Sequence, residues 1–149
     1  MLSKSEIREL KRLAVKIRID TIKSIANFGA GHVGGAMSMV ETLAVLYGKI
    51  MRYDTKNPDW KDRDWFICSK GHSGPSLYAT LAIEGFFPEE ELKTLNQGGT
   101  KLPSHCNKDL TKGVDMSTGS LGQGSSLAVG VALGNLSLIH ISEPTRRRG

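Results

Sequence analysis

The N-terminal segment carries apolar residues along one face of a predicted helix. From Ser3 to Phe28 these residues recur at steps of three, four and five, which is roughly one face of an amphipathic helix. Ser3 and Glu6 have the spacing of a capping box, so we expect the helix to begin there. Gly29 follows the last periodic residues and predicts the end of the helix. Lys and Arg fill much of the opposite face, which we expect to be solvated.

The next apolar stretches predict a helix, a strand and a further helix. Ser38 and Glu41 repeat the capping-box spacing, and the apolar stripe over residues 40–50 predicts a second helix with a buried face. Residues 65–68 form a short run of strand-forming residues, which is followed by a glycine-rich loop and a helix over 76–85. This order is the βα arrangement, in which ligands lie at the C-terminal ends of strands.

The C-terminal part is organised around the glycine-rich stretch 117–124. Three glycines within six residues allow a tight turn and a close approach to a ligand. The small apolar residues over 125–134 predict a buried helix that packs against a sheet. A glycine-rich turn that leads into a helix N-terminus can bind an anion, but a tight turn before a packed helix explains the same residues. The stretch is neither the dinucleotide fingerprint nor a P-loop, because it lacks the P-loop Lys.

A short helix over 88–95 and a long polar connection over 97–116 complete the pattern. Pro88 lies near the start of that helix, and acidic residues fill its first turn. The connection has no convincing periodicity and contains His105. Long segments without periodicity in compact domains are often functional.

Composition places the chain among ordinary globular proteins. It has 149 residues, 39% hydrophobic and 23% charged, which suits one domain with its own core. We expect no secretory signal and no membrane span. Two distant cysteines, Cys68 and Cys106, form no disulfide framework, so we expect a cytoplasmic protein. Part of the net charge of +5 comes from the last residues, and the remainder predicts no nucleic-acid binding.

Three histidines fall in predicted loops. His32 and His72 are flanked by glycine, and His105 lies in the polar connection. Each alone is most simply an exposed or locally bonded imidazole, but together with the glycine-rich stretch they predict one site if their loops converge. Imidazole donates to phosphate or sugar oxygens and moves protons near neutral pH. Zinc is disfavoured because spacings of 40 and 33 residues match no usual pattern. A Cys106–His105 nucleophile is disfavoured because adjacent residues tend to point apart.

Several of these segments together resemble the motifs of transketolases. Residues 31–35 with 43–47 resemble "GHPGG…LAVLY", residues 62–72 resemble "DRDRFVLSKGH", and residues 117–124 match "STGSLGQG". The order and spacing also fit, over about residues 5 to 135. The form is similar to the split-gene type, in which an N-terminal subunit carries the diphosphate-binding domain and a separate C-terminal subunit carries the pyrimidine-binding domain.

The resemblance implies a fold, a reaction and a set of partners. The fold is α/β, a thiamine-diphosphate-binding domain with a parallel sheet flanked by helices, which would be incomplete here. The reaction transfers a two-carbon ketol unit between sugar phosphates of the pentose phosphate pathway. Thiamine diphosphate and Mg²⁺ or another divalent cation are the implied cofactors. The implied partner is the C-terminal transketolase subunit, with two copies of each subunit forming a heterotetramer.

The resemblance also assigns roles to residues of this chain. His32 and His72 would lie near the cofactor diphosphate and the donor substrate, and His105 near the reacting hydroxyls. All three would be catalytic, and the first two would also bind the cofactor. Backbone contacts to the cofactor would come from four residues of the glycine-rich stretch, which are Gly119, Ser120, Leu121 and Gly122.

The chain departs from the resembled motifs at three places. Val33 stands where proline is usual, which loosens the loop but leaves the imidazole in place. Residues 104–107 read Ser-His-Cys-Asn where the family has "GHPD" or "GHPE", so a negative charge near the sugar is missing. The motif Gly-Asp-Gly followed by a downstream Asn, which supplies the oxygen ligands of the metal, is absent after Gly134. No metal ligand is therefore assigned in this chain.

The sequence divides into two parts at Asn135. Residues 1–135 are expected to be the N-terminal part of the thiamine-diphosphate-binding domain. Residues 136–149 contain a stretch that resembles the translated reading of a sequencing adapter, so we expect this tail not to be native and His140 to carry no function. A genuine basic tail that binds nucleic acid or anionic lipid is the alternative. We expect the chain alone to be inactive.

Two other functions stay open on the sequence. One is a neighbouring thiamine enzyme such as a deoxyxylulose-phosphate synthase, although the "STGSLGQG" form and the spacing of the motif at 62–72 favour transketolase. The other is a non-catalytic phosphate-binding module, which would bind phosphate ligands without selectivity for thiamine and without a partner subunit.

Overall fold

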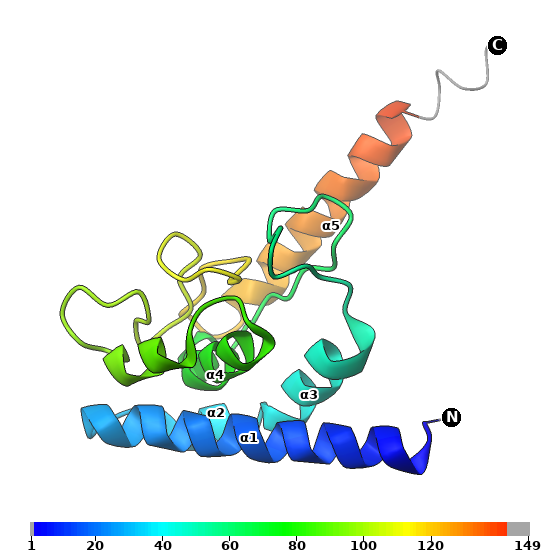
Figure 1. The fold of residues 1–149 in the computed structure, drawn as a ribbon. Coiled ribbons are helices and arrows are strands. Elements are labelled where there is room, and N and C mark those ends of the chain that lie inside the picture. Colours follow the sequence, from blue (N-terminus) through cyan, green and yellow to red (C-terminus); the bar gives the residue numbers. More distant parts are fainter. Residues whose placement is uncertain (1, 143–149) are drawn as a thin grey trace.

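Residues 2–142 are described by the computed structural model, and they form helices joined by two long connections (Figure 1). The helix α1 runs along one side of the molecule, and α2, α3 and α4 pack against it. The helix α5 projects away from this body. The helices are α1 (Lys4–Phe28), α2 (Val33–Met37), α3 (Val40–Val45), α4 (Gly74–Glu84) and α5 (Gln123–Ser142), with a π-helical turn at Leu46–Ile50 and 3₁₀ turns at Gly71–Ser73 and Glu89–Thr94.

The ends of α1 are those that the sequence predicts. The Ser3 hydroxyl accepts a hydrogen bond from the Glu6 N–H at 3.2 Å, and the Glu6 carboxylate accepts one from the Ser3 N–H at 2.8 Å. These reciprocal bonds form the predicted capping box. Gly29 ends the helix with φ of 85°, a left-handed conformation that glycine adopts without steric cost. The predicted first helix is therefore confirmed.

The core lies between α1, α3 and α4. Ile17, Leu43, Tyr78 and Leu81 are fully buried there. Nearly every residue of α4 is buried, including its small polar ones. A helix that is buried on all sides belongs at the centre of a domain, so α4 is the element on which the preceding and following loops rest.

The predicted second helix over residues 40–50 is confirmed, as α3 followed directly by the π-helical turn at Leu46–Ile50. The short helix α2 at Val33–Met37, next to His32, was not predicted. The predicted capping box at Ser38 and Glu41 does not form. The Ser38 hydroxyl instead donates to the Gly35 carbonyl at 2.9 Å, and Glu41 pairs with Arg18. A local carbonyl has taken the Ser38 hydroxyl, and a tertiary ion pair has taken the Glu41 carboxylate.

The predicted strand at residues 65–68 is also wrong, because this segment has no regular secondary structure. Backbone groups of a strand need a neighbouring strand. Here the Phe66 N–H donates to the Asp115 carboxylate at 2.7 Å, and the Cys68 carbonyl accepts from the Thr118 hydroxyl at 2.6 Å. No strand is assigned anywhere between residues 2 and 142, so the parallel sheet stays a prediction.

The helix α5 forms as predicted but is not buried. Val129 is 59% exposed and Leu133 is 61% exposed, and a Cβ added at Gly130 would meet no atom within 4 Å. Figure 1 shows why, since α5 extends beyond the other described elements. The helix runs on through residue 135. The predicted boundary there stays a prediction, and residues 143–149 of the tail lie outside the described part.

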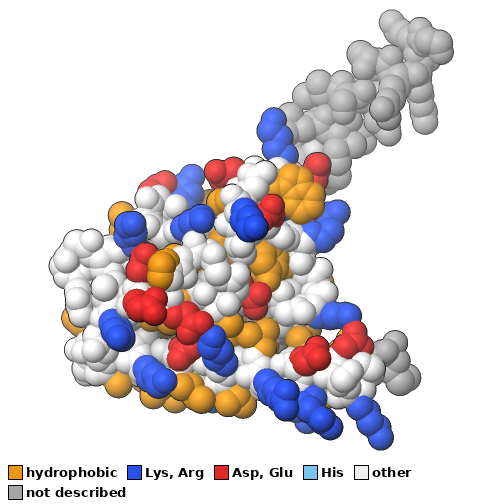
Figure 2. Space-filling model, viewed as in Figure 1, with side chains coloured by type: hydrophobic (Ala, Val, Ile, Leu, Met, Phe, Trp, Pro, Cys, Tyr) orange, Lys and Arg blue, Asp and Glu red, His pale blue; other side chains and the backbone are white. Residues whose placement is uncertain are grey.

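An apolar stripe lines the outer face of α1. Val15, Ile19 and Ile22 are 52%, 46% and 48% exposed, and their spacing places them on one side of the helix. Figure 2 shows hydrophobic side chains along this edge, flanked by Lys and Arg. Among the helices of residues 2–142, none is long and apolar enough to cross a membrane.

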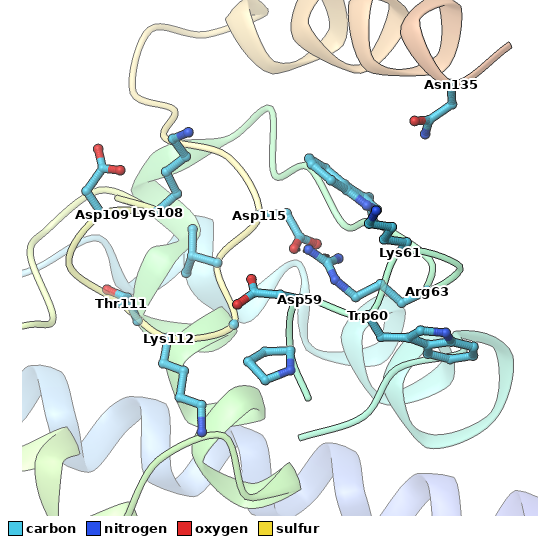
Figure 3. Close-up of a pocket in the computed structure, with 14 residues that line it drawn as sticks. Asp59, Trp60, Lys61, Arg63, Lys108, Asp109, Thr111, Lys112, Asp115 and Asn135 are labelled. Atoms are coloured by element: carbon cyan, nitrogen blue, oxygen red, sulfur yellow. Dashed lines mark ion pairs between the residues drawn. The ribbon is translucent and has the colours of Figure 1, made fainter. Parts of the chain in front are cut away.

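A buried ion pair joins the two long connections. The Arg63 guanidinium lies 2.7 Å from the Asp115 carboxylate, with side chains 12% and 7% exposed, and it stacks over Trp65 at 4.8 Å. Figure 3 shows the pair in a pocket of about 650 Å³, which Lys61, Lys108 and other residues line. Burial raises the pKa of Asp115, and the bonds from Phe66 and Arg63 oppose that shift. The pair therefore positions the connections more than it stabilises the fold.

We predict that Asp115→Asn destabilises the chain strongly, because Arg63 would remain buried without a counter-charge. The expected loss in the free energy of unfolding is about 3–5 kcal/mol, measured by urea denaturation. The matched control is Glu89→Gln, which removes an exposed ion pair with Lys16 and should cost less than about 1 kcal/mol. Equal losses in the two variants would contradict this role of the pair.

Candidate functional site

The structure brings the three loop histidines together. His32 precedes α2, His72 lies in the 3₁₀ turn before α4, and His105 lies in the second connection. The centroid of the His32 ring is 5.3 Å from that of His72 and 5.4 Å from that of His105. His72 is partly buried, whereas His32 and His105 are exposed. The loops thus converge, while the roles assigned to the three side chains stay predictions.

Two glycines allow this convergence. A Cβ at Gly35 would lie 2.6 Å from the Cδ2 atom of His72, and a Cβ at Gly71 would lie 2.3 Å from the Thr118 carbonyl oxygen. Real Cβ atoms do not approach other atoms so closely, and the crowded neighbours are parts of the site itself. The glycine-rich loops are therefore needed for backbone contact around the histidines.

Thr118 connects the loops that carry the histidines. Its N–H donates to the Cys106 carbonyl at 3.0 Å, and its hydroxyl donates to the Cys68 carbonyl at 2.6 Å. Its own carbonyl lies against Gly71. One buried residue therefore holds the loop before His72 and the loop around His105. The sequence analysis missed this role, and the only available signal was the place of Thr118 within the glycine-rich stretch.

The core helix α4 and the residue before it also hold the histidine loops in place. The Tyr78 hydroxyl donates to the His105 carbonyl at 3.0 Å, and the Ser73 hydroxyl, next to His72, donates to the Gly35 carbonyl at 3.0 Å. Both donors lie at or near the buried start of α4. The backbones of the histidine loops are thus bonded to the best-packed part of the fold.

The start of α5 offers less to an anion than the sequence pattern indicates. The Ser125 N–H donates to the Ser69 hydroxyl at 3.1 Å, and the Gln123 N–H donates to the Ser120 carbonyl at 3.1 Å. These two N-terminal N–H groups are used within the chain. The loop residues before the helix are more accessible, since Ser120, Leu121 and Gly122 are exposed. A Cβ at Gly119 would lie 3.9 Å from the His105 ring, so this loop borders the histidine cluster.

The electrostatics of the cluster favour a neutral His72. Partial burial lowers the pKa of His72, and the nearby His32, Lys70 and His105 side chains lower it further. The Lys70 ammonium donates a hydrogen bond to the Ser38 hydroxyl, a contact that the sequence analysis did not foresee. A neutral imidazole has one donor and one acceptor nitrogen. His72 can therefore donate a hydrogen bond through one ring nitrogen and accept one through the other.

A pocket of about 430 Å³ opens beside His105. No carboxylate lines it, and the Asn107 side chain there accepts hydrogen bonds from the N–H groups of Asp109 and Leu110 at 2.9 and 3.2 Å. Its polar groups, among them the His105 imidazole, can form hydrogen bonds with hydroxyl or phosphate oxygens. The lining residues are Pro103, Ser104, His105, Cys106, Asn107, Ser117, Thr118 and Gln123. The 650 Å³ pocket of Figure 3 contains none of the three histidines.

These groups fit an anionic organic cofactor better than a metal ion. Three imidazoles, the Lys70 ammonium and an exposed glycine-rich backbone can all donate to phosphate oxygens. Within residues 2–142, no group of three or more His, Cys, Asp or Glu side chains is placed to hold a metal ion.

Comparisons with known proteins agree on one family. Residues 10–143 match the family described as transketolase, thiamine diphosphate binding domain. The chain is 54% identical over 125 residues to the 6-deoxy-6-sulfo-D-fructose transketolase subunit SqwG of Clostridium sp. (strain MSTE9), covering 84% of this chain and 46% of that protein. It is 40% identical over 125 residues to a transketolase of Treponema pallidum, covering 83% and 19%.

Solved structures agree with the sequence matches. The transketolase from Leishmania mexicana superimposes with a TM-score of 0.79 at 37% identity, covering 83% of this chain and 18% of that one. The transketolase from Campylobacter jejuni gives 0.75 at 30% identity, covering 87% and 20%. The chain thus spans about half the length of the SqwG relative and about a fifth of the others, within their thiamine-diphosphate-binding fold.

We predict that Gly71→Ala destabilises the site, because the new Cβ would displace the Thr118 carbonyl. The free energy of unfolding should fall by about 1–3 kcal/mol in urea denaturation. Gly98→Ala is the matched control, since a Cβ there would meet nothing within 4 Å, and it should change stability by less than about 0.5 kcal/mol. A Gly71→Ala chain as stable as the control would show that Thr118 does not fix this loop.

The protonation of His72 tests the electrostatics of the histidine cluster. An NMR titration should give His72 a pKa below its ordinary value, and His32→Gln should raise it because one positive neighbour is removed. Lys93→Gln, which removes a charge on the turn Glu89–Thr94, should leave it unchanged. The pKa of His72 is lower in the folded chain than in the unfolded chain, so the unfolded chain binds the proton first as the pH falls. The free energy of unfolding should therefore decrease as the pH falls from the unfolded-state pKa of His72 to its folded-state pKa. A His72 pKa that is unmoved by His32→Gln would contradict the charge coupling.

Proposed function

Because the chain belongs to the transketolase family, we propose that it forms part of the N-terminal subunit of a split transketolase. The whole enzyme would transfer a two-carbon ketol unit from a ketose phosphate to an aldose phosphate. The observation that carries the proposal is the convergence of His32, His72 and His105 beside the glycine-rich stretch, in a chain that matches the thiamine-diphosphate-binding domain.

Each residue of the cluster has a proposed task. His32 and His72 donate hydrogen bonds to diphosphate oxygens and to the donor sugar, and Gly119, Ser120, Leu121 and Gly122 supply backbone contacts to the cofactor. Bound thiamine diphosphate supplies a stabilised carbanion that can carry a two-carbon unit. His105, which lines the 430 Å³ pocket, holds the substrate hydroxyls and moves protons between them and solvent.

The whole enzyme requires parts beyond this chain. We propose that a C-terminal subunit carries the pyrimidine-binding domain and that two copies of each subunit assemble. The relative SqwG is itself named as a transketolase subunit. The parallel sheet of the family fold and a divalent cation with oxygen ligands are likewise proposed for the whole subunit. The proposed setting is the pentose phosphate pathway in the cytoplasm.

A second candidate concerns the donor sugar. The SqwG relative is named for 6-deoxy-6-sulfo-D-fructose and is 54% identical to this chain, against 40% for the Treponema transketolase. Asn107 replaces an acidic residue of the resembled motif and lines a pocket without carboxylates. An uncharged wall there would repel an anionic sugar less than a carboxylate does. We therefore propose a donor ketose with an anionic group at C6, either a sulfonate or a phosphate.

The test is a ketol-transfer assay on the full-length subunit combined with its C-terminal partner. Turnover should require thiamine diphosphate, and 6-deoxy-6-sulfo-D-fructose and fructose 6-phosphate are compared as donors with one aldose phosphate acceptor. His105→Ala should lower kcat/KM by about 10²–10⁴-fold, whereas Lys93→Gln should leave it unchanged. The 149-residue chain alone should show no turnover.

Three outcomes would contradict the proposal. Turnover by the chain alone would show that the partner is not required. Ketol transfer without added thiamine diphosphate would show that the reaction does not require this cofactor. Binding of inorganic phosphate without any selectivity for thiamine diphosphate, and without association with the partner, would favour the phosphate-binding module instead.

A further inference from the structure

We propose that Cys68 and Cys106 form a redox-responsive thiol pair, which closes to a disulfide between the loop before His72 and the loop around His105. Neither thiol has a task in the proposed ketol transfer, so this inference stands apart from it. The two cysteines are 38 positions apart in the sequence. They stand where the resembled motifs have leucine and proline.

The backbone brings the two cysteines to the same place. Both of their carbonyls accept hydrogen bonds from Thr118, at 2.6 Å for Cys68 and 3.0 Å for Cys106. The Cys106 N–H donates to the Gly71 carbonyl at 3.4 Å, and the Cys68 thiol donates to the Lys70 carbonyl at 3.2 Å. Neighbouring carbonyls of one loop therefore bind both residues, which holds their side chains side by side.

The two thiols donate to adjacent carbonyls of one loop, Cys68 to Lys70 at 3.2 Å and Cys106 to Gly71 at 3.7 Å. The neighbouring Cys106 thiol lowers the pKa of Cys68, whereas the Cys68 thiol together with burial raises the pKa of Cys106. Loss of the first proton from the pair is therefore easier than from an isolated buried thiol, and a thiolate is the form that reacts with oxidants and disulfides. Both cysteines are free and buried, at 4% and 2% exposure.

A small oxidant can reach the pair from the site. Cys106 lines the 430 Å³ pocket beside His105, so hydrogen peroxide can approach it from there. One thiol of the pair attacks peroxide as its thiolate, an S–O bond forms, the O–O bond breaks, and the leaving hydroxide takes a proton to become water. The sulfur of the second thiol then attacks the first and loses its proton, the S–S bond forms, and the hydroxyl leaves as a second water. Two thiols are oxidised and one peroxide is reduced.

The disulfide would lock the geometry of the histidine cluster. It would add a covalent link parallel to the hydrogen bonds of Thr118, and it would fix the distance between the loops of His72 and His105. Reduction by a small dithiol would reopen it. The cluster would then be held rigidly under oxidising conditions and by hydrogen bonds alone under reducing ones.

The test is peroxide treatment of the reduced, folded 149-residue chain. We expect both thiols to disappear together in a thiol titration, with the loss of two hydrogens by intact mass and a Cys68–Cys106 link in a non-reducing peptide map. Dithiothreitol should restore both thiols. In Cys106→Ser the remaining Cys68 should stop at a sulfenic acid that dimedone traps, and Cys68→Ser should form no internal link.

The wild-type measurement decides the proposal even if a variant fails to fold. Two thiols that stay free at peroxide concentrations which oxidise exposed cysteine would overturn it. So would oxygen addition at each cysteine without a link, or a disulfide between two chains in place of the internal one. These readouts need no cofactor, so their failure is separate from failure of the ketol-transfer proposal.

Discussion

Thr118 is the residue on which the geometry of the site depends. Its N–H, hydroxyl and carbonyl reach Cys106, Cys68 and Gly71, which lie in two connections that are distant in sequence. A buried hydroxyl left without its partner costs more than the bond itself contributes, so loss of the Cys68 carbonyl partner would be costly. Because the loops of His72 and His105 are tied at this residue, their rings can lie 5.3 and 5.4 Å from the His32 ring.

The described part of the chain is well packed around α4 and open around α5. The helix α4 is buried and anchors the histidine loops through Tyr78 and Ser73. The helix α5 carries apolar residues, yet Val129 and Leu133 remain exposed. Burial of one such side chain contributes roughly 1.5–3 kcal/mol. The site is thus built on the packed half, and α5 requires a cover that residues 2–142 do not supply.

The sequence predicted local features well and tertiary ones unevenly. The capping box at Ser3 and the left-handed Gly29 follow from local chemistry, so both were predictable. His32 and His72 were found because glycine marks tight loops, and His105 because it lies in a long polar connection. Nothing in the sequence fixes the distance between their rings. The strand at residues 65–68 failed because strand pairing is non-local. The role of Thr118 and the Arg63–Asp115 pair could not be predicted, because both join residues about 50 positions apart.

The central claim is that the three histidines and the glycine-rich stretch bind one cofactor. The most direct measurement is a crystal structure of the full-length subunit with its partner and thiamine diphosphate. The account predicts diphosphate oxygens within about 3.2 Å of the His32 and His72 rings, with the loop at Gly119–Gly122 against the cofactor. A diphosphate bound instead in the 650 Å³ pocket beside Lys61 and Arg63 would contradict it.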